Sequence, residues 1–304
     1  MKNIDAPETD DEAAELTALG SRVLAEAGHG DMIWGHLAVR DPGGRGVWMK
    51  AAGWGLEEIE PERVVLVSWD GERLSGDGPL HLEFHIHTEV MRARPDVQVS
   101  VHTHSGTVNA FASLGEPLRP LSHDAVAFAE HGLPNFGATA NLIRTQELGR
   151  ALAADLGPAR ACLMPQHGLL TVGPDIAHAV MYAVLLERAC GLQLAARAAG
   201  GPRHWTGHQE SLEKDALVWA SGQIAAGWRY WVRRTERRTR RSGPTGGPSP
   251  QRKAAAFSAT HCSNDRAGVA LRQPRRCSRS PTAASLSSGL IAARLSCGRA
   301  PGTG

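Results

Sequence analysis

Residues 97–104 read VQVSVHTH and place two histidines at the end of an apolar stretch. Valine alternates with polar residues here, which is the period of a strand with one buried side. Residues two apart on a strand point to the same side, so His102 and His104 would present their imidazoles next to each other. Such a pair suits a divalent metal ion, and it also occurs where polar residues at a strand end bond to backbone groups. The segment therefore predicts a strand and raises the question of a metal site.

The segments around this strand alternate between helical and strand periodicity. Apolar residues recur at helical spacing in six stretches, several with a capping residue before them or Gly or Pro after them. These expected helices cover residues 10–26, 81–94, 106–113, 145–157, 175–200 and 210–234. Further expected strands form a hairpin over residues 36–50 and cover 63–69, 73–76, 160–165 and 169–173. Because hairpins interrupt the alternation, we expect a three-layer α/β/α domain around a mixed, largely antiparallel sheet.

The net charge of +2 conceals two unlike parts of the chain. Residues up to 232 carry more acidic than basic side chains, whereas residues 233–304 are rich in Arg and almost free of acidic residues. We expect a flexible N-terminus over 1–9, one folded domain over 10–232 and a disordered basic tail over 233–304. Binding of nucleic acid is not expected, because Phe257 is the only aromatic residue of the tail. A second interpretation of the abrupt change in composition is translation in a wrong frame.

The cysteines and the apolar residues predict the compartment. Five cysteines form no C-x-x-C pair, and their number is odd, which is typical of a protein of the reducing cytoplasm. Residues 1–16 are acidic and lack the apolar core of a secretory signal. No run of about 18 consecutive apolar residues occurs, so no membrane span is expected. We therefore expect a cytoplasmic protein.

Two further residues strengthen the case for a metal site. Glu83 lies in the expected helix that precedes the histidine pair, and His167 lies in PQHGLL, at a sharp turn between two short strands. A third imidazole held at a turn can complete a set of three ligands and leave coordination positions open for a substrate.

The spacing of these residues resembles a known family. RPDVQVSVHTHS at 94–105, followed by CLMPQHGLLTVG at 162–173 and preceded by GHLAVRDPGG at 35–44, is similar to the class II aldolase/adducin family, from about Leu16 to about Ala199. The resemblance implies one divalent metal ion per chain, with zinc as the first choice and manganese, cobalt or iron as alternatives, and assembly as a homotetramer. The implied metal ligands are His102, His104 and His167. The implied acid/base or substrate-displaced ligand is Glu83.

Departures from the family pattern indicate the substrate class. The sugar-phosphate aldolases of the family hold phosphate with Gly-Asn, Thr-Pro-Ser/Thr-Gly and Ser-Ser motifs. Here Gly35-His36, the KAAG of residues 50–53 and His81-Leu82 stand near those positions, so most hydroxyl and amide donors are missing. The pattern resembles the decarboxylase branch, and we expect decarboxylation of a hydroxy-aromatic, dihydroxyphthalate-like acid through a metal-stabilised enolate. The alternatives are aldol cleavage of a hydroxy-carbonyl or sugar-phosphate substrate, and a non-catalytic adducin-like interaction module.

Five further residues complete the expected site. His36, Lys50 and His81 are expected to bind the small-molecule substrate, and His123 is a second candidate for proton transfer beside Glu83. For each histidine the competing interpretation is a capping or surface residue. Tyr230 is a candidate substrate-binding residue because aromatic residues near the C-terminus of family members reach a neighbouring subunit's site.

Overall fold

The computed structural model describes residues 6–242, so the expectations for residues 1–5 and 243–304 lie outside the described residues. A seven-stranded sheet has the order β4-β3-β2-β1-β5-β7-β6. The strands are β1 (His36–Arg40), β2 (Gly46–Lys50), β3 (Val64–Ser68), β4 (Arg73–Ser75), β5 (Val99–Thr103), β6 (Ala161–Met164) and β7 (Gly168–Gly173). All pairings between these strands are antiparallel, and the one parallel contact within residues 6–242 is an isolated bridge between Asn135 and Leu163. The expected sheet is confirmed, but it is antiparallel rather than mixed.

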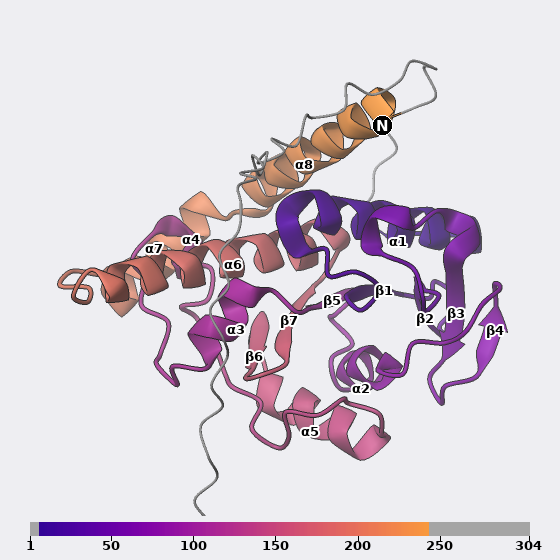
Figure 1. Ribbon diagram of the computed structural model, residues 1–304, viewed down its shortest axis with the longest axis horizontal. Helices are drawn as coiled ribbons and strands as arrows, with labels where there is room; N and C mark the ends of the chain where they lie inside the picture. Colours follow the sequence, from indigo (N-terminus) through magenta and orange to yellow (C-terminus); the bar gives the residue numbers. More distant parts are fainter. Residues whose placement is uncertain (1–5, 243–304) are drawn as a thin grey trace, which may run out of the picture. The chain divides into compact units, whose positions relative to one another are not determined.

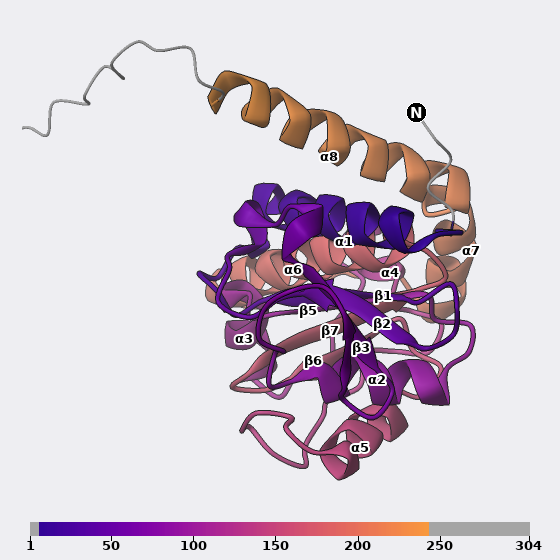
Figure 2. The same cartoon turned by 90° about the vertical axis from the view of Figure 1, so that its right-hand side faces the viewer.

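Helices cover both faces of the sheet, which confirms the three-layer arrangement (Figures 1 and 2). The longer helices are α1 (Asp10–Leu24), α2 (Phe84–Ala93), α5 (Gln146–Leu156), α6 (Ile176–Ala198), α7 (His208–Val218) and α8 (Ser221–Ser242). The short ones are α3 (Gly106–Ala112), α4 (His123–Val126), a π-turn η1 (Ala25–His29) and the 3-10 turns η2 (Leu56–Glu58) and η3 (Pro61–Arg63). In Figure 2, α1, α6 and α8 lie on one side of the sheet and α2 and α5 on the other.

Alternation along the strands produces two apolar cores. On β1, Leu37 and Val39 pack with α1 and α6, whereas Ala38 faces α2 and α5. Such alternation is the period-two pattern that the sequence shows. Cys162 and Cys190 are buried free thiols, and burial raises the pKa of each to about 12, so both are inert core residues.

Helix α6 lies between the sheet and α8 and is apolar on almost every side. By length and composition it is the one described helix that could cross a membrane, but 61% of its most apolar window is buried inside the protein. Asp175 caps its first turn by accepting a hydrogen bond from the His178 N–H at 2.8 Å. A helix buried in this way is the core helix of a globular domain.

The C-terminal helix differs from the expectation. Residues 210–234 were expected to form one helix, but Trp219 leaves the helical conformation, with φ −115° and ψ 23°, and separates α7 from α8. Helix α8 then continues to Ser242, beyond residue 232, where the folded domain was predicted to end. Apolar periodicity ends near that position, yet Arg234 and Arg238 hold the next turns by pairing with the Glu26 carboxylate at 2.7 and 2.9 Å.

The sheet order brings distant residues to one end of three neighbouring strands. His36 pairs with His102 across β1 and β5, and Thr103 pairs with Leu169 across β5 and β7. The turn between β6 and β7 therefore lies beside the end of β5. Gly168 permits this approach, because a Cβ atom there would lie 2.4 Å from the Thr103 carbonyl oxygen.

Candidate metal centre and active site

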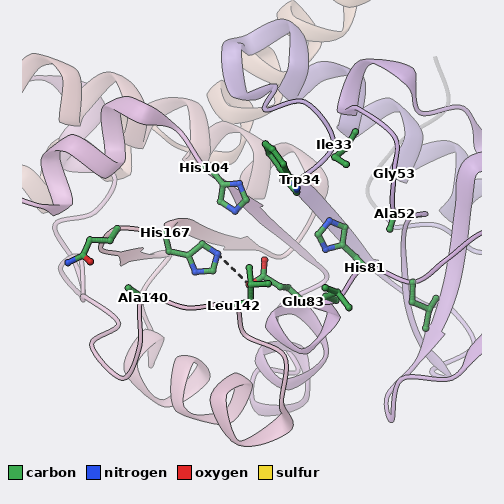
Figure 3. A pocket seen from close by; sticks show the side chains of 13 residues that line it. Ile33, Trp34, Ala52, Gly53, His81, Glu83, His104, Ala140, Leu142 and His167 are labelled. Atoms are coloured by element: carbon green, nitrogen blue, oxygen red, sulfur yellow. Dashed lines mark ion pairs between the residues drawn. The ribbon is translucent and has the colours of Figure 1, made fainter.

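Four side chains from three parts of the sequence converge at this end of the sheet. The members of this group are Glu83, His102, His104 and His167, and their ligand atoms lie within 4.8 Å of one another. Figure 3 shows three of them, Glu83, His104 and His167, around one pocket. Glu83 directly precedes α2, the two histidines come from the end of β5, and His167 comes from the β6–β7 turn. The structure thus brings together the four residues whose spacing suggested a metal site.

His102 and His104 each use one ring nitrogen to bind the protein. The His102 Nδ1–H donates to the Leu169 carbonyl at 2.9 Å, and the His104 Nδ1–H donates to the Asp31 carboxylate at 2.8 Å. A neutral imidazole that donates from Nδ1 carries a lone pair on Nε2, and the two Nε2 atoms face each other at 3.0 Å. Burial, with the neighbouring His104, holds the pKa of His102 well below its usual value, so this ring is neutral. Two facing lone pairs suit a cation between them.

His167 and Glu83 complete the group. His167 is buried, and its two ring nitrogens have no hydrogen-bond partner in the described part of the chain. Its Nε2 lies 3.4 Å from Glu83 Oε1, which also accepts a hydrogen bond from the Ile143 N–H at 2.8 Å. A buried imidazole whose nitrogens make no hydrogen bond costs free energy unless a charged neighbour or a ligand satisfies it. Three imidazoles and one carboxylate fit a divalent ion such as zinc, manganese, cobalt or iron.

The Glu83 carboxyl group is held in its charged form. Burial raises its pKa, but the His167 ring and the Ile143 N–H together outweigh burial, so the pKa lies below its usual value. Glu83 is only 2% exposed. A buried carboxylate with one oxygen fixed by the backbone can act as a metal ligand or as a base.

A second set of histidines lies behind the first. His36 Nδ1 and His87 Nε2 share a hydrogen bond of 2.7 Å, and His87 Nδ1 lies 2.6 Å from Ser100 Oγ. The His36 and His81 rings lie 4.1 Å apart between centroids, and both come within 4.8 Å of the Glu83 carboxylate. Burial lowers the pKa of His87 to about 3 and that of His81 to about 4, so both rings are neutral near pH 7.

A pocket of about 530 Å³ opens onto this end of the sheet (Figure 3). Its polar lining consists of His81, Glu83, His104, Gln166 and His167. The rest of the lining is largely apolar: Ile33, Trp34, Ala52, Gly53, Leu80, Leu82, Ala140 and Leu142. The wall therefore includes Ala52 and Leu82, which the sequence resemblance placed near the phosphate-binding motifs of aldolases.

Four of the predicted substrate or proton-transfer residues do not line the pocket. His36 is fully buried behind His81, and the Lys50 ammonium donates to the carbonyls of Ile33 at 2.6 Å and Trp54 at 2.7 Å. Lys50 therefore positions loops of the pocket rim in place of the predicted contact with substrate. His123 is exposed at the start of α4, where its carbonyl accepts the Trp219 Nε1–H. Tyr230 is 50% exposed on α8, beside three arginines.

Several contributors to the site were not predicted from the sequence, and Asp31 and Trp34 are two of them. Asp31 binds His104, and Trp34 forms part of the pocket wall. Both lie in the segment between η1 and β1, which has neither helical nor strand periodicity. The only signal near them is the adjacent Gly35-His36 motif.

Comparison with known proteins gives the family of this chain. Residues 15–194 match the family model "Class II Aldolase and Adducin N-terminal domain". The chain belongs to the class II aldolase and adducin family. This membership confirms the resemblance noted in the sequence, and the matched residues include all four members of the metal-site group.

Individual members of the class II aldolase family differ in their reactions. The chain is 34% identical to "Decarboxylase NovR" of Streptomyces niveus over 57% of the chain, and 30% identical to "3,4-dihydroxyphthalate decarboxylase" of Arthrobacter keyseri over 64%. It spans 64% of the length of NovR and 83% of the second protein. Among solved structures, "L-fuculose 1-phosphate aldolase from Glaciozyma antarctica PI12" has a TM-score of 0.69 and 26% identity, covering 78% of this chain and 96% of that one.

Proposed function

We propose that this chain is a divalent-metal-dependent carbon–carbon lyase that decarboxylates a hydroxy-aromatic carboxylic acid. The proposal rests on one observation: Glu83, His104 and His167 of the metal-site group line a pocket whose remaining wall is largely apolar. The decarboxylases among its relatives support the same reaction class. We also infer that the protein is cytoplasmic and forms a homotetramer. We expect it to bind zinc in preference to manganese, cobalt or iron, as the family resemblance implies.

The ligand group sets the chemistry. His102, His104 and His167 would hold the ion, with Glu83 as a further ligand before substrate enters. A divalent ion there would supply Lewis-acid stabilisation of negative charge that develops on a substrate oxygen. The protein's part is to orient the imidazoles, and the buried Nδ1–H of His102 does so through the Leu169 carbonyl.

The pocket wall favours an aromatic acid over a sugar phosphate. Trp34, Leu82 and Leu142 present apolar surface, on which a flat ring can pack. A phosphate requires several convergent donors, and Ala52 and Leu82 offer none from their side chains. His81 lines the pocket beside the carboxylate of Glu83. A neutral imidazole carries one N–H, so His81 would serve as a donor to a substrate carboxylate or hydroxyl oxygen.

Glu83 is the proton-transfer group of the proposed reaction. As a carboxylate it can take the proton of the substrate hydroxyl and deliver it to the ring carbon that bears the leaving carboxylate, which gives the keto tautomer. The carbon–carbon bond then breaks, its electron pair returns to the ring and its oxygen, and CO2 departs. Water protonates the oxygen of the resulting phenolate. His123, the second predicted proton-transfer group, lies outside this pocket.

Aldol cleavage is the second candidate, because the fold is similar to that of an L-fuculose 1-phosphate aldolase. The two reactions are distinguished by measuring CO2 release from 3,4-dihydroxyphthalate beside aldehyde release from L-fuculose 1-phosphate, with the zinc-loaded chain. We expect CO2 release and no aldehyde. Aldehyde release without CO2 from any hydroxy-aromatic acid would overturn the proposal, and a chain that binds no metal would point to the adducin-like module.

A variant of the pocket wall sharpens this assay. Trp34→Ala should raise KM for the aromatic acid by an amount equivalent to about 0.5–1.5 kcal/mol, because the substrate ring loses an aromatic partner. Trp205→Ala is the matched control, since Trp205 is 48% exposed, close to the 46% of Trp34, and lies outside the pocket lining. Equal KM values in both variants would contradict the aromatic-acid assignment.

A further inference from the structure

The turn that precedes β1 has an unusual backbone. Met32 and Gln166 are the two non-glycine residues with positive φ among residues 6–242, at +47° and +65°. Each is adjacent to a residue of the metal-site region, Met32 to Asp31 and Gln166 to His167. Left-handed conformations of non-glycine residues cost free energy and concentrate at functional sites. The backbone of this turn is thus held in a conformation that its sequence does not favour.

Asp31 is the residue that this turn presents to the site. Its Oδ2 accepts a hydrogen bond from His104 Nδ1 at 2.8 Å, and its side chain is 30% exposed. This bond fixes the tautomer in which His104 Nε2 is unprotonated, and Nε2 is the atom that lies 3.0 Å from His102 Nε2.

Both ends of the turn are anchored. On one side, His29 Nδ1 lies 3.0 Å from Thr103 Oγ1 and His29 Nε2 lies 3.0 Å from Glu187 Oε2. Thr103 stands between the two histidines of β5, so this anchor ties the turn to the strand that carries them. On the other side, the Lys50 ammonium donates to the Ile33 carbonyl at 2.6 Å. Asp31 therefore lies between two anchored residues, His29 and Ile33, which restrict its movement relative to His104.

We propose that Asp31 is a positioning residue of the metal centre, whose carboxylate, aimed by the anchored turn, orients His104 and increases its strength as a metal ligand. This inference rests on the metal-dependent function proposed above. A carboxylate that accepts from the distal nitrogen of a metal-binding imidazole raises the basicity of the coordinating nitrogen, and loss of such a partner weakens metal affinity about 10- to 100-fold.

The test is the zinc dissociation constant of the full chain, measured without substrate by competition with a chromophoric chelator. Asp31→Ala should weaken zinc binding about 10- to 100-fold, and Asp31→Asn should weaken it less, because an amide oxygen still accepts from His104 but lacks the charge. Asp70→Ala is the matched control, since Asp70 is an exposed carboxylate that pairs with Arg92 elsewhere on the surface. It should bind zinc as the wild-type chain does.

A double-mutant cycle separates positioning from a general structural effect. If Asp31 acts through His104, Asp31→Ala should change zinc affinity no further in a His104→Ala chain. Zinc affinity of Asp31→Ala within twofold of wild type, or an undiminished effect in the His104→Ala background, would overturn the inference while leaving the lyase proposal intact. A wild-type chain that binds no zinc or other divalent ion would overturn both.

Discussion

At the scale of single residues, the site depends on which ring nitrogen each histidine gives to the protein. His102 and His104 bind a carbonyl and a carboxylate through Nδ1, so their Nε2 atoms are left for a ligand. His87 instead uses both nitrogens within the protein, on His36 and Ser100. Neighbouring histidines therefore have different capacities for metal binding, although their residue type is the same.

Substitution of Glu83 tests whether its carboxylate transfers a proton. Glu83→Gln keeps the shape of the side chain and removes the base, so kcat should fall about 10²- to 10⁴-fold while KM changes little. The comparison is Glu147→Gln, which removes an exposed carboxylate on α5. Metal content is measured in parallel, so that a lost ligand can be distinguished from a lost base. A Glu83→Gln variant with near-wild-type kcat would show that Glu83 transfers no proton.

At the scale of elements, the site exists because β1, β5 and β7 are neighbours in the sheet. Their periodicity predicts the strands from sequence, and the family resemblance names the ligands. Periodicity does not predict which strands are adjacent, and it gives no signal for the turn that carries Asp31. The sequence also does not predict the role of Lys50. A lysine near a pocket suggests a contact with substrate, and only the structure shows that its ammonium binds two backbone carbonyls. The sequence gives no signal for the break at Trp219, because residues 210–234 have helical spacing throughout.

Gly168 tests the close approach of β7 to β5. Gly168→Ala would place a Cβ atom 2.4 Å from the Thr103 carbonyl oxygen, a backbone atom that cannot turn away. We expect a loss of about 1–3 kcal/mol in the free energy of unfolding, measured by urea denaturation, and weaker metal binding because His167 is the preceding residue. Gly106→Ala is the control, since no atom lies within 4 Å of its added Cβ. Equal unfolding midpoints for the two variants would contradict the packing described for this turn.

At the scale of the whole molecule, helix α8 connects the acidic and basic parts of the chain. Glu26 is paired with Arg234 and Arg238, and Thr235 is buried, so the helix contributes to the domain beyond the point where apolar periodicity ends. The change in charge near residue 233 therefore does not coincide with a change in structure.

Two truncations locate the functional end of the domain. A chain ending at Ser242 should unfold at the Tm of the full chain and keep its metal. A chain ending at residue 232 loses both arginine partners of Glu26 and the buried Thr235, so its Tm should lie below that of the chain ending at Ser242. Ion pairs of half-exposed arginines contribute little, so we expect a decrease of only a few degrees. Equal Tm values for the two truncated chains would show that the last turns of α8 add no stability.

The metal site is tested most directly by the metal content of the purified full chain, determined by elemental analysis beside a His102→Ala/His104→Ala variant. We expect about one divalent ion per wild-type chain, because three imidazoles and a carboxylate converge on one point. We expect the variant to lose this ion while it retains its fold by circular dichroism. Full metal occupancy in the variant, or none in the wild-type chain, would contradict a metal site at these residues.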